Sequence, residues 1–323
     1  MKTDCVTEIS IDPSRSDGPA KTLVVITGPT ASGKTVLAIE TARRLGAEIV
    51  SADSRQMFRG LPIGTAAPSE EELAAIPHHF IGNLDVTEYY SAACFEEEAI
   101  ALLARLFSHS DYAVMCGGSM MYVDAVTRGI DSLPTISPRT REAAYSLLEH
   151  EGIEAVRRRL AELDPEYLAT ADPDNHKRLV HALEICMESG VPYSSLRTGQ
   201  TKPRPFRIIK FAIDLPREIL FNRINSRVDH MIQSGLVEEA RGMLPYRHLN
   251  ALNTVGYKEM FAYLDGVWDL ETATARMAKN TRVYAKKQLT WLKRDNSVIW
   301  LDGTKDTDEM AVQLISLLPT TRQ

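Results

Sequence analysis

The chain has 323 residues, of which 44% are hydrophobic and 25% are charged, and its formal net charge at pH 7 is −6. This composition is that of an ordinary soluble globular protein. The acidic balance argues mildly against a surface coated with nucleic acid but leaves room for a local basic groove. The longest apolar runs are too short to span a bilayer.

The first 20 residues are polar and lack the apolar segment of a secretory signal, so we predict a loose lead-in over 1–20. The four cysteines are widely scattered and form no CxxC pair. This usage fits a reducing cytoplasm and gives neither a zinc site nor a disulfide framework. We therefore expect a cytoplasmic protein that contacts no membrane.

Short apolar, β-branched runs alternate with amphipathic stretches in the first third of the chain. The predicted elements are a strand at 22–27, a helix at 35–46, a strand at 47–54, a helix at 91–107 and a strand at 111–118. Such alternation indicates an α/β fold with a parallel sheet. Ligands of these sheets gather at the carboxyl ends of the strands.

The pattern changes near residue 131, after which the chain is almost entirely helical up to residue 195. We predict a helical insertion domain over 131–195, and an α/β core made of 21–130 and 196–323. Within the second part of the core, 205–215 has the pattern of a strand, 217–293 is helical, and 297–303 is a last strand.

The segment GPTASGKT, Gly28 to Thr35, matches GxxxxGK[ST] between a predicted strand and a predicted helix. Backbone N–H groups of such a loop point at phosphate oxygens, and the helix N-terminus adds partial positive charge. Lys34 is placed to neutralise the phosphates, and Thr35 to reach a magnesium ion. The loop alone does not say whether ATP or another diphosphate occupies it.

Asp53 follows the second strand, at the same edge of the predicted sheet. It could cap the turn that follows, which is common for Asp after a strand. It could instead act as a base that faces the phosphate site, or hold magnesium as in a small-molecule kinase.

Basic side chains gather in three places. In the helix 279–294, Lys279, Arg282, Lys286 and Lys293 fall near one face, with aromatic and amide residues between them. This face is either solvated or part of a nucleic-acid groove. A second group is His176-Lys177-Arg178. Arg223 and Arg227 share a third helix face, where they could pair with nearby acids or clamp an anion.

As a set, these motifs resemble the tRNA dimethylallyltransferase (tRNA isopentenyltransferase) family in its bacterial form. The resemblance runs from about residue 22 to residue 302. It is carried by GPTASGKT, SADSRQMFRGLPIGTAAP, HHFIGNLDVTEYYSAACF, GGSMMYVDAV, DPDNHKRLVHALEI, RVDHMIQSGLVEEA, TVGYKEM and RVYAKKQLTWLKR. It implies a P-loop NTPase/kinase-like α/β core with an all-helical insertion.

The resemblance also implies a reaction. Family members transfer the dimethylallyl group of dimethylallyl diphosphate to the exocyclic amine of the adenine on the 3′ side of the anticodon. The products are isopentenyl-adenine, in tRNAs that read codons beginning with U, and diphosphate. The partners implied are the tRNA anticodon loop and dimethylallyl diphosphate, and the cofactor is Mg²⁺. We further expect a monomer.

The resemblance assigns roles to individual residues. It implies that Asp53 is the base, that Arg227 binds the diphosphate, and that Thr35, Ser119 and Arg141 lie near the reacting centre. The diphosphate site comprises Gly28, Pro29, Thr30, Ala31, Ser32, Gly33, Lys34, Thr35 and Arg223. The residues implied to contact tRNA are Asp53, Ser54, Arg55, Gln56, Lys177, Arg178, His181, Thr254, Gly256, Tyr257, Lys258, Arg282, Lys286, Lys287 and Gln288. Thr35 is the implied metal ligand.

Four positions depart from the commonest family pattern, and one of them is Phe58, which stands where a Tyr is usual. Ala67 and His181 stand where a Lys and an Arg are usual, which could weaken tRNA binding. Ser119 stands where a Thr is usual, and this change keeps a hydroxyl.

Two other functions share some of these features: a P-loop small-molecule or nucleoside kinase, and a tRNA-binding protein without activity. The kinase reading gives no reason for the basic helix at 279–294.

Overall fold

The computed structural model describes residues 21–319, so the predicted lead-in at 1–20 lies outside the described residues. The chain forms two compact units. One contains the described residues 21–127 and 204–319, and the other is Arg128–Pro203. We call them the sheet unit and the helical unit. The assignment of 131–195 as an insertion domain stays a prediction.

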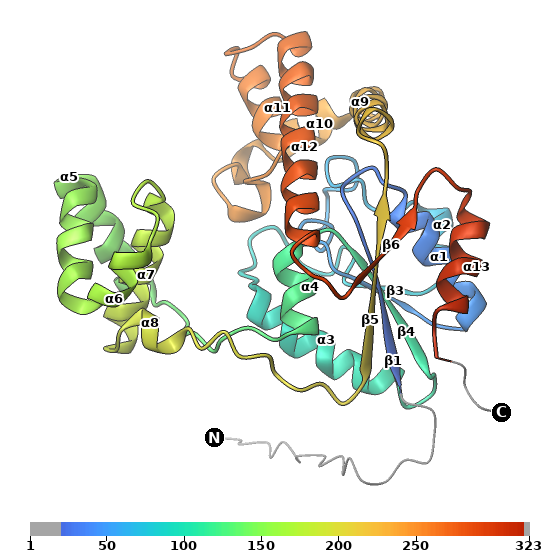
Figure 1. Cartoon of the computed structure of the whole chain (residues 1–323). Coiled ribbons are helices and arrows are strands. Elements are labelled where there is room, and N and C mark those ends of the chain that lie inside the picture. Colours follow the sequence, from blue (N-terminus) through green and yellow to red (C-terminus); the bar gives the residue numbers. More distant parts are fainter. Residues whose placement is uncertain (1–20, 320–323) are drawn as a thin grey trace, which may run out of the picture. The chain divides into compact units, whose positions relative to one another are not determined.

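The sheet unit is built on six strands in the order β3-β2-β4-β1-β5-β6 (Figure 1). All neighbouring strands pair in parallel. The strands are β1 (Thr22–Thr27), β2 (Ile49–Ser51), β3 (His78–His79), β4 (Tyr112–Gly117), β5 (Arg207–Asp214) and β6 (Val298–Asp302). Their carboxyl ends lie at one edge of the sheet, where the polar loops meet.

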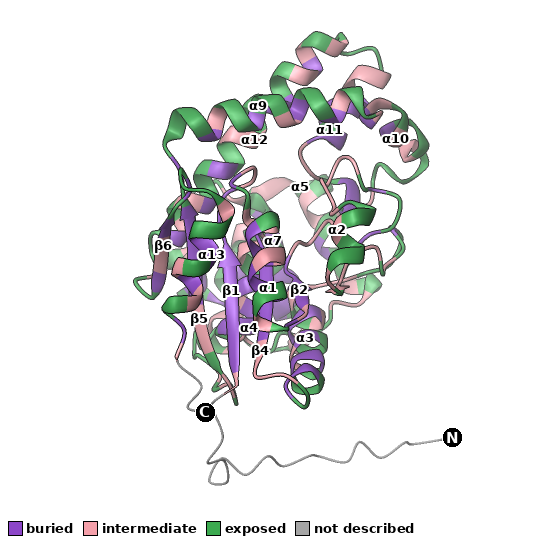
Figure 2. Ribbon diagram, turned by 90° about the vertical axis from the view of Figure 1, so that its right-hand side faces the viewer, coloured by how far each residue is buried: buried purple, intermediate pink, exposed green. Residues whose placement is uncertain are grey.

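Helices cover both faces of the sheet, and alternate residues of each strand enter different cores. Val24 and Ile26 of β1 pack in the cluster that includes residues of α1 (Lys34–Leu45) and α13 (Thr307–Ser316). Leu23 and Val25 pack on the other face, against α3 (Ala92–Leu106) and α4 (Met120–Thr127). Figure 2 shows β1 buried along its length between these layers. Burial on both faces is why β1 is a continuous apolar run.

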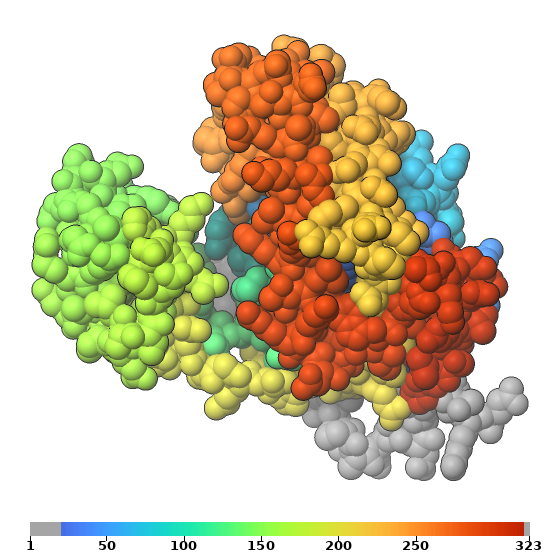
Figure 3. Space-filling view, turned by 45° about the horizontal axis from the view of Figure 1, so that its top comes forward, coloured from blue at the N-terminus to red at the C-terminus, as the bar shows by residue number. Residues whose placement is uncertain are grey.

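A further layer of helices packs around its own core in the same unit. Its elements are α9 (Arg217–Gln233), α10 (Leu236–Gly242), the 3₁₀ turns η1 (Leu244–Tyr246) and η2 (Asn250–Leu252), α11 (Tyr257–Leu264) and α12 (Leu270–Leu292). Their apolar side chains form one cluster with Phe58, Leu61 and Val86. Helices α9 and α12 lie side by side, and Figure 3 shows their surfaces in contact.

The helical unit contains α5 (Pro138–Leu163), α6 (Pro165–Thr170), α7 (His176–Ser189) and α8 (Tyr193–Leu196). It has its own core, centred on Leu160, Leu179 and Leu183. Within residues 21–319, no helix combines the length and the apolar character that crossing a bilayer requires.

The strands predicted at 22–27, 47–54, 111–118, 205–215 and 297–303 are confirmed as β1, β2, β4, β5 and β6. The α/β class is confirmed too. The prediction missed the two-residue β3, the short helix α2 (Glu70–Ala75), α4 and α13. Strand β3 is too short to produce an alternating pattern, and its residues, His78 and His79, are not typical strand formers.

Strands β2 and β4 approach each other closely at the edge where the polar loops meet. The Ala52 N–H donates to the Cys116 carbonyl oxygen at 2.8 Å, and the Ser119 N–H donates to the Ala52 carbonyl oxygen at 3.2 Å. A Cβ atom at Gly117 would lie 2.2 Å from that Ala52 oxygen. Only glycine permits this approach, which places Asp53 next to the Gly117-Gly118 turn.

We predict that Gly117→Ala lowers the free energy of unfolding by about 1–3 kcal/mol, because the new methyl group overlaps main-chain atoms that cannot turn aside. Urea unfolding measures the change. Gly242→Ala in α10 is the control, since a Cβ there meets no atom within 4 Å. It should be neutral or stabilising by up to about 1 kcal/mol. Equal stability of Gly117→Ala and the wild type would contradict the prediction.

Candidate active site

The loop between β1 and α1 has the conformation of a phosphate cradle. Gly28, Ala31 and Gly33 have positive φ values of 152°, 64° and 95°. The first amides of α1 have no intrahelical acceptor and point out of the helix end. The Ser32 hydroxyl is buried without a hydrogen-bond partner among the described residues. These features leave several donors for an anion at the helix N-terminus.

Gln288 of α12 braces this loop from the side. Its Oε1 accepts the Thr30 N–H at 2.9 Å, and its Nε2 donates to the Gly118 carbonyl oxygen at 2.8 Å. The side chain is 2% exposed. A Cβ at Gly118 would lie 2.4 Å from Nε2, so glycine at 118 makes room for the amide. Gln288, predicted to contact tRNA, therefore holds two loops of the site together.

Two arginines of α9 reach the same loop. Arg223 donates from a guanidinium nitrogen to the Ser32 carbonyl oxygen at 3.3 Å. Arg227 donates to the Thr30 hydroxyl at 3.1 Å. Neither forms an ion pair within residues 21–319, so the pairing with nearby acids that the sequence left open is absent there. Their positive charge is directed at the phosphate cradle.

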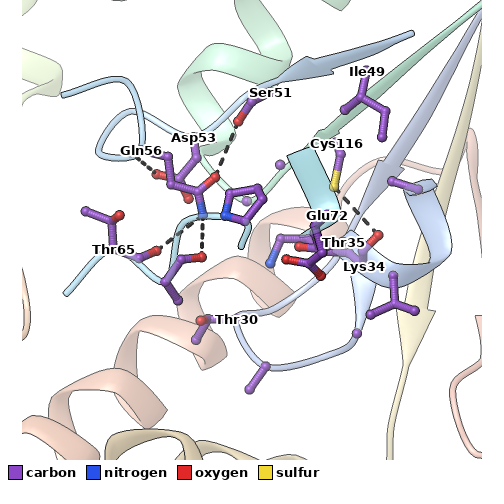
Figure 4. A pocket seen from close by; sticks show the side chains of 18 of the residues that line it. Thr30, Lys34, Thr35, Ile49, Ser51, Asp53, Gln56, Thr65, Glu72 and Cys116 are labelled. Atoms are coloured by element: carbon purple, nitrogen blue, oxygen red, sulfur yellow. Dashed lines mark hydrogen bonds between the residues drawn. The ribbon is translucent and has the colours of Figure 1, made fainter. Parts of the chain in front are cut away.

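Lys34 lines the same cavity as these two arginines. Figure 4 shows Lys34 in this cavity, with Thr30, Thr35 and Asp53. Burial lowers the pKa of Lys34, the positive charge of Arg227 lowers it further, and Asp53 acts in the opposite direction. Burial also lowers the pKa of Arg227. Buried cations without a full set of counter-charges are stabilised by an anion, so the electrostatics favour a negatively charged ligand here.

Asp53 caps the turn that follows it, whereas its role as a base stays a prediction. Its Oδ1 accepts the N–H groups of Arg55 at 2.9 Å and Gln56 at 3.4 Å, which caps the turn. Its other oxygen, Oδ2, accepts no hydrogen bond from any described residue. One oxygen thus orients the carboxylate, and the other remains available to a ligand. Nearby, the Ser119 hydroxyl accepts the Ser54 N–H at 2.9 Å. The hydroxyl that Ser119 shares with the Thr usual at this position therefore forms a hydrogen bond in this structure.

Two cavities meet at Asp53. The first, ≈ 470 Å³, contains the phosphate loop, Lys34 and Thr35. The second, ≈ 540 Å³, is lined by residues of the α9–α12 layer, among them Thr254, Lys258 and Lys287. The residues that line both are Thr30, Asp53, Thr65, Arg227 and Tyr284. A ligand in one cavity therefore lies next to a ligand in the other, with the carboxylate between them.

Comparison with known proteins agrees with this geometry. The IPP transferase family model matches residues 56–295. The chain is 50% identical over 289 residues to tRNA dimethylallyltransferase 1 of Phocaeicola vulgatus, covering 90% of this chain and 96% of that protein. It is 48% identical over 280 residues to the tRNA dimethylallyltransferase of Christiangramia forsetii, covering 87% and 93%.

The chain belongs to the tRNA dimethylallyltransferase family.

Solved structures are similar as well. The tRNA isopentenylpyrophosphate transferase from Bacillus halodurans has a TM-score of 0.68 with the transferase described here, at 34% identity, covering 92% of this chain and 95% of that one. A eukaryotic dimethylallyltransferase acting on tRNA has a TM-score of 0.78 at 24% identity, covering 94% and 81%, and shares the fold.

The structure of the transferase distributes the residues predicted to contact tRNA over different environments. Tyr257 is fully buried, and Gly256 is buried next to it. Arg282 donates to Asn225 of α9, and the Lys286 ammonium lies 5.8 Å from the centroid of the Phe221 ring.

Four predicted residues lie in the helical unit: Lys177, Arg178 and His181 on α7, and Arg141 on α5. Arg141 donates to the largely buried Glu184 at 3.3 Å. Its predicted place near the reacting centre stays a prediction.

A network that the sequence analysis missed holds the loop 61–66. The Glu239 carboxylate of α10 accepts the N–H groups of Ile63 at 2.8 Å and Gly64 at 2.7 Å, and the Tyr257 hydroxyl at 2.6 Å. A Cβ at Gly64 would lie 2.5 Å from the Tyr257 ring. Glu239 thus holds the middle of the loop, and Gln56 holds the end at Thr65 and Ala66.

Gln56 donates to the carbonyl oxygens of Thr65 at 3.2 Å and Ala66 at 2.9 Å (Figure 4). Gly64 and Thr65 line the second cavity, and Thr65 and Ala66 line the first. Glu239 is thus a positioning residue for a wall of both cavities. The signal that could have found it is its place in SGLVEEA, one of the segments that carry the family resemblance.

We predict that Glu239→Ala destabilises the transferase by about 2–4 kcal/mol, because two amides and one hydroxyl lose their acceptor. It should also raise KM for both substrates, since a wall of both cavities loosens. Steady-state kinetics and urea unfolding measure the two effects. Glu238→Ala, at an exposed neighbour, is the control and should stay within about 0.5 kcal/mol. Unchanged KM values in a folded Glu239→Ala protein would contradict the positioning role.

The lowered pKa of Lys34 predicts a pH dependence of anion binding. As the pH rises, the ammonium loses its proton earlier than an ordinary lysine, whose pKa is about 10.4, and the attraction for the anion falls. We expect KM for dimethylallyl diphosphate to rise with pH already below about 10, where an ordinary lysine would still be charged. Lys34→Arg, which keeps its proton throughout this range, should flatten the rise. An equal rise in both proteins would assign it to another group.

Proposed function

We propose that this chain transfers the dimethylallyl group of dimethylallyl diphosphate to the exocyclic amine of the adenine on the 3′ side of the anticodon in tRNA. The observation that carries the proposal is the meeting of two cavities at Asp53, in a chain that belongs to the dimethylallyltransferase family. The first cavity takes the diphosphate substrate, and the second takes the target base. We extend the proposal to tRNAs that read codons beginning with U.

The leaving group sets the main electrostatic task. As the allylic C–O bond breaks, positive charge develops on carbon and negative charge on the diphosphate oxygens. Lys34, Arg223, Arg227 and the free amides of the loop stabilise that negative charge from fixed positions. Gln288 contributes by holding the loop against Gly118, so that the donors need no rearrangement during the reaction.

Asp53 activates the amine. The lone pair of an adenine amine is delocalised into the ring, so the amine is a weak nucleophile. In the proposed complex, Oδ2 of Asp53 accepts a hydrogen bond from the amine and takes its proton as the C–N bond forms. The capped Oδ1 fixes the direction of the carboxylate. The products are prenylated adenine and diphosphate, with the proton on the carboxylate.

The residues present could bind magnesium only together with oxygen atoms of the substrate. Within the described residues, no cluster of three or more His, Cys, Asp or Glu side chains could hold a metal by itself. Mg²⁺ usually retains water and binds through one or two protein oxygens and substrate phosphates. The Thr35 hydroxyl, with diphosphate oxygens and water, provides such a set. The bound ion would neutralise charge on the leaving group.

The target base must leave its loop to reach the second cavity. Bases in RNA loops can be unstacked and inserted between protein groups at modest energy. Lys258 and Lys287 line this cavity and would contact the phosphates of the loop. Lys177 and Arg178 of the helical unit are exposed and are proposed as further phosphate contacts.

The test mixes purified protein, magnesium, labelled dimethylallyl diphosphate and unmodified tRNA with adenine on the 3′ side of the anticodon, without ATP. We expect label in the tRNA. Asp53→Ala should reduce turnover by about 100-fold or more, as loss of a general base does, with little change in tRNA affinity. Asp53→Asn is the matched variant, because its side chain retains an oxygen for the turn but accepts no proton.

Absence of transfer by the wild type, together with ATP-dependent phosphorylation of a small molecule, would support a kinase instead. tRNA binding without release of diphosphate would support a non-catalytic binding protein. Wild-type turnover in Asp53→Ala would leave the transferase proposal intact but remove Asp53 as the base.

A further inference from the structure

A third cavity, ≈ 430 Å³, opens beside the second one and has no role in the proposed reaction. Its lining includes five aromatic side chains, together with Met121 and Arg55: Phe58, Tyr89, Tyr90, Tyr122 and Tyr284. Tyr89 and Tyr90 precede α3, and Met121 and Tyr122 lie in the first turn of α4. The cavity therefore lies on the sheet unit, next to the Gly117-Gly118 turn.

The floor of this cavity is rigid. Tyr122 is 8% exposed and stacks on Phe95, with ring centroids 4.6 Å apart and planes at 22°. The Tyr90 ring is tilted against Tyr122 at 6.4 Å. Its hydroxyl donates to Glu98 at 3.0 Å, which fixes the ring. A flat ligand therefore meets a preformed aromatic surface.

The rim, in contrast, is exposed. Tyr89 is 68% exposed and Met121 is 64% exposed, which places them among the most exposed large apolar side chains of the described residues. Arg55 lies on the same rim, where it donates one hydrogen bond to the Asn250 carbonyl oxygen at 2.6 Å. Its other guanidinium N–H groups can donate to a ligand. Flat aromatic and thioether surfaces beside a guanidinium suit a nucleobase attached to a phosphate.

The third cavity is continuous with the cavity proposed for the target base. Ser54, Arg55, Ser119 and Tyr284 line both. Because consecutive nucleotides are covalently joined, a base in the second cavity brings its neighbours to this shared wall. Both the position of the third cavity and the chemistry of its lining therefore favour the base of a neighbouring nucleotide.

We propose that the third cavity binds the base of a loop nucleotide adjacent to the target adenine, stacked against Tyr89 and Met121. The inference rests on the proposed function, and it adds a second base site to it. Stacking on an aromatic side chain tolerates every base, so this site contributes affinity and orientation rather than sequence choice. It also keeps the target strand unstacked while the reaction occurs.

The first experiment uses the full-length protein and an anticodon stem–loop RNA. Tyr89→Ala should raise the Kd of the RNA about 5- to 100-fold, the range expected for one lost base stack. The KM for dimethylallyl diphosphate should not change. Tyr89→Phe, which keeps the ring, should bind as the wild type does. Tyr246→Ala is the matched control, because Tyr246 is also exposed, at 40%, and lines none of the three cavities.

The second experiment identifies which neighbour is bound. A 2-aminopurine placed on the 5′ or the 3′ side of the target adenine is expected to be quenched by stacking at one of the two positions when the wild type binds. Tyr89→Ala should remove that quenching. Quenching at neither position, or an unchanged Kd in Tyr89→Ala, would overturn the inference. Prenyl transfer by the wild type in the same preparations separates this failure from failure of the proposed function.

Discussion

The buried amide of Gln288 joins three parts of the chain that are distant in the sequence: the phosphate loop, the turn after β4, and α12. Because both ends of the amide are hydrogen-bonded and Gln288 is almost fully buried, the position of the side chain is determined within narrow limits. The contact connects the phosphate loop to α12, and it requires glycine at 118 because a Cβ there would overlap the amide.

Helix α12 consequently contributes side chains to both cavities, the one proposed for the diphosphate and the one proposed for the target base. Gln288 faces the phosphate loop, whereas Lys287 lines the cavity proposed for the target base. Tyr284 lines all three cavities. The basic residues Arg282 and Lys286 instead pack toward Phe221 of α9. The charged face of α12 is thus partly a helix–helix contact, and its aromatic and amide residues form the site.

Local motifs explain what could be predicted from the sequence. The strand, loop and helix around GPTASGKT are contiguous, so their pattern predicted both the cradle and its place in the sheet. Asp53 also followed from its place after a strand. The Glu239–Tyr257 network, the brace by Gln288 and the shared walls of the cavities depend on contacts between residues more than about 100 positions apart in most cases. Periodicity and spacing carry no information about such contacts.

The contact between Gly64 and Tyr257 constrains how this chain could change over evolutionary time. Any side chain at residue 64 would overlap the tyrosine ring, so a smaller residue would have to appear at 257 first. That first step removes the hydroxyl from Glu239 and leaves a void in a packed layer. Tyr257 would therefore have to be replaced before Gly64. The protein that carries only the first replacement would be less stable than the present protein or the one with both replacements. Replacement of the loop residue Gly64 is therefore blocked by a side chain at the start of α11.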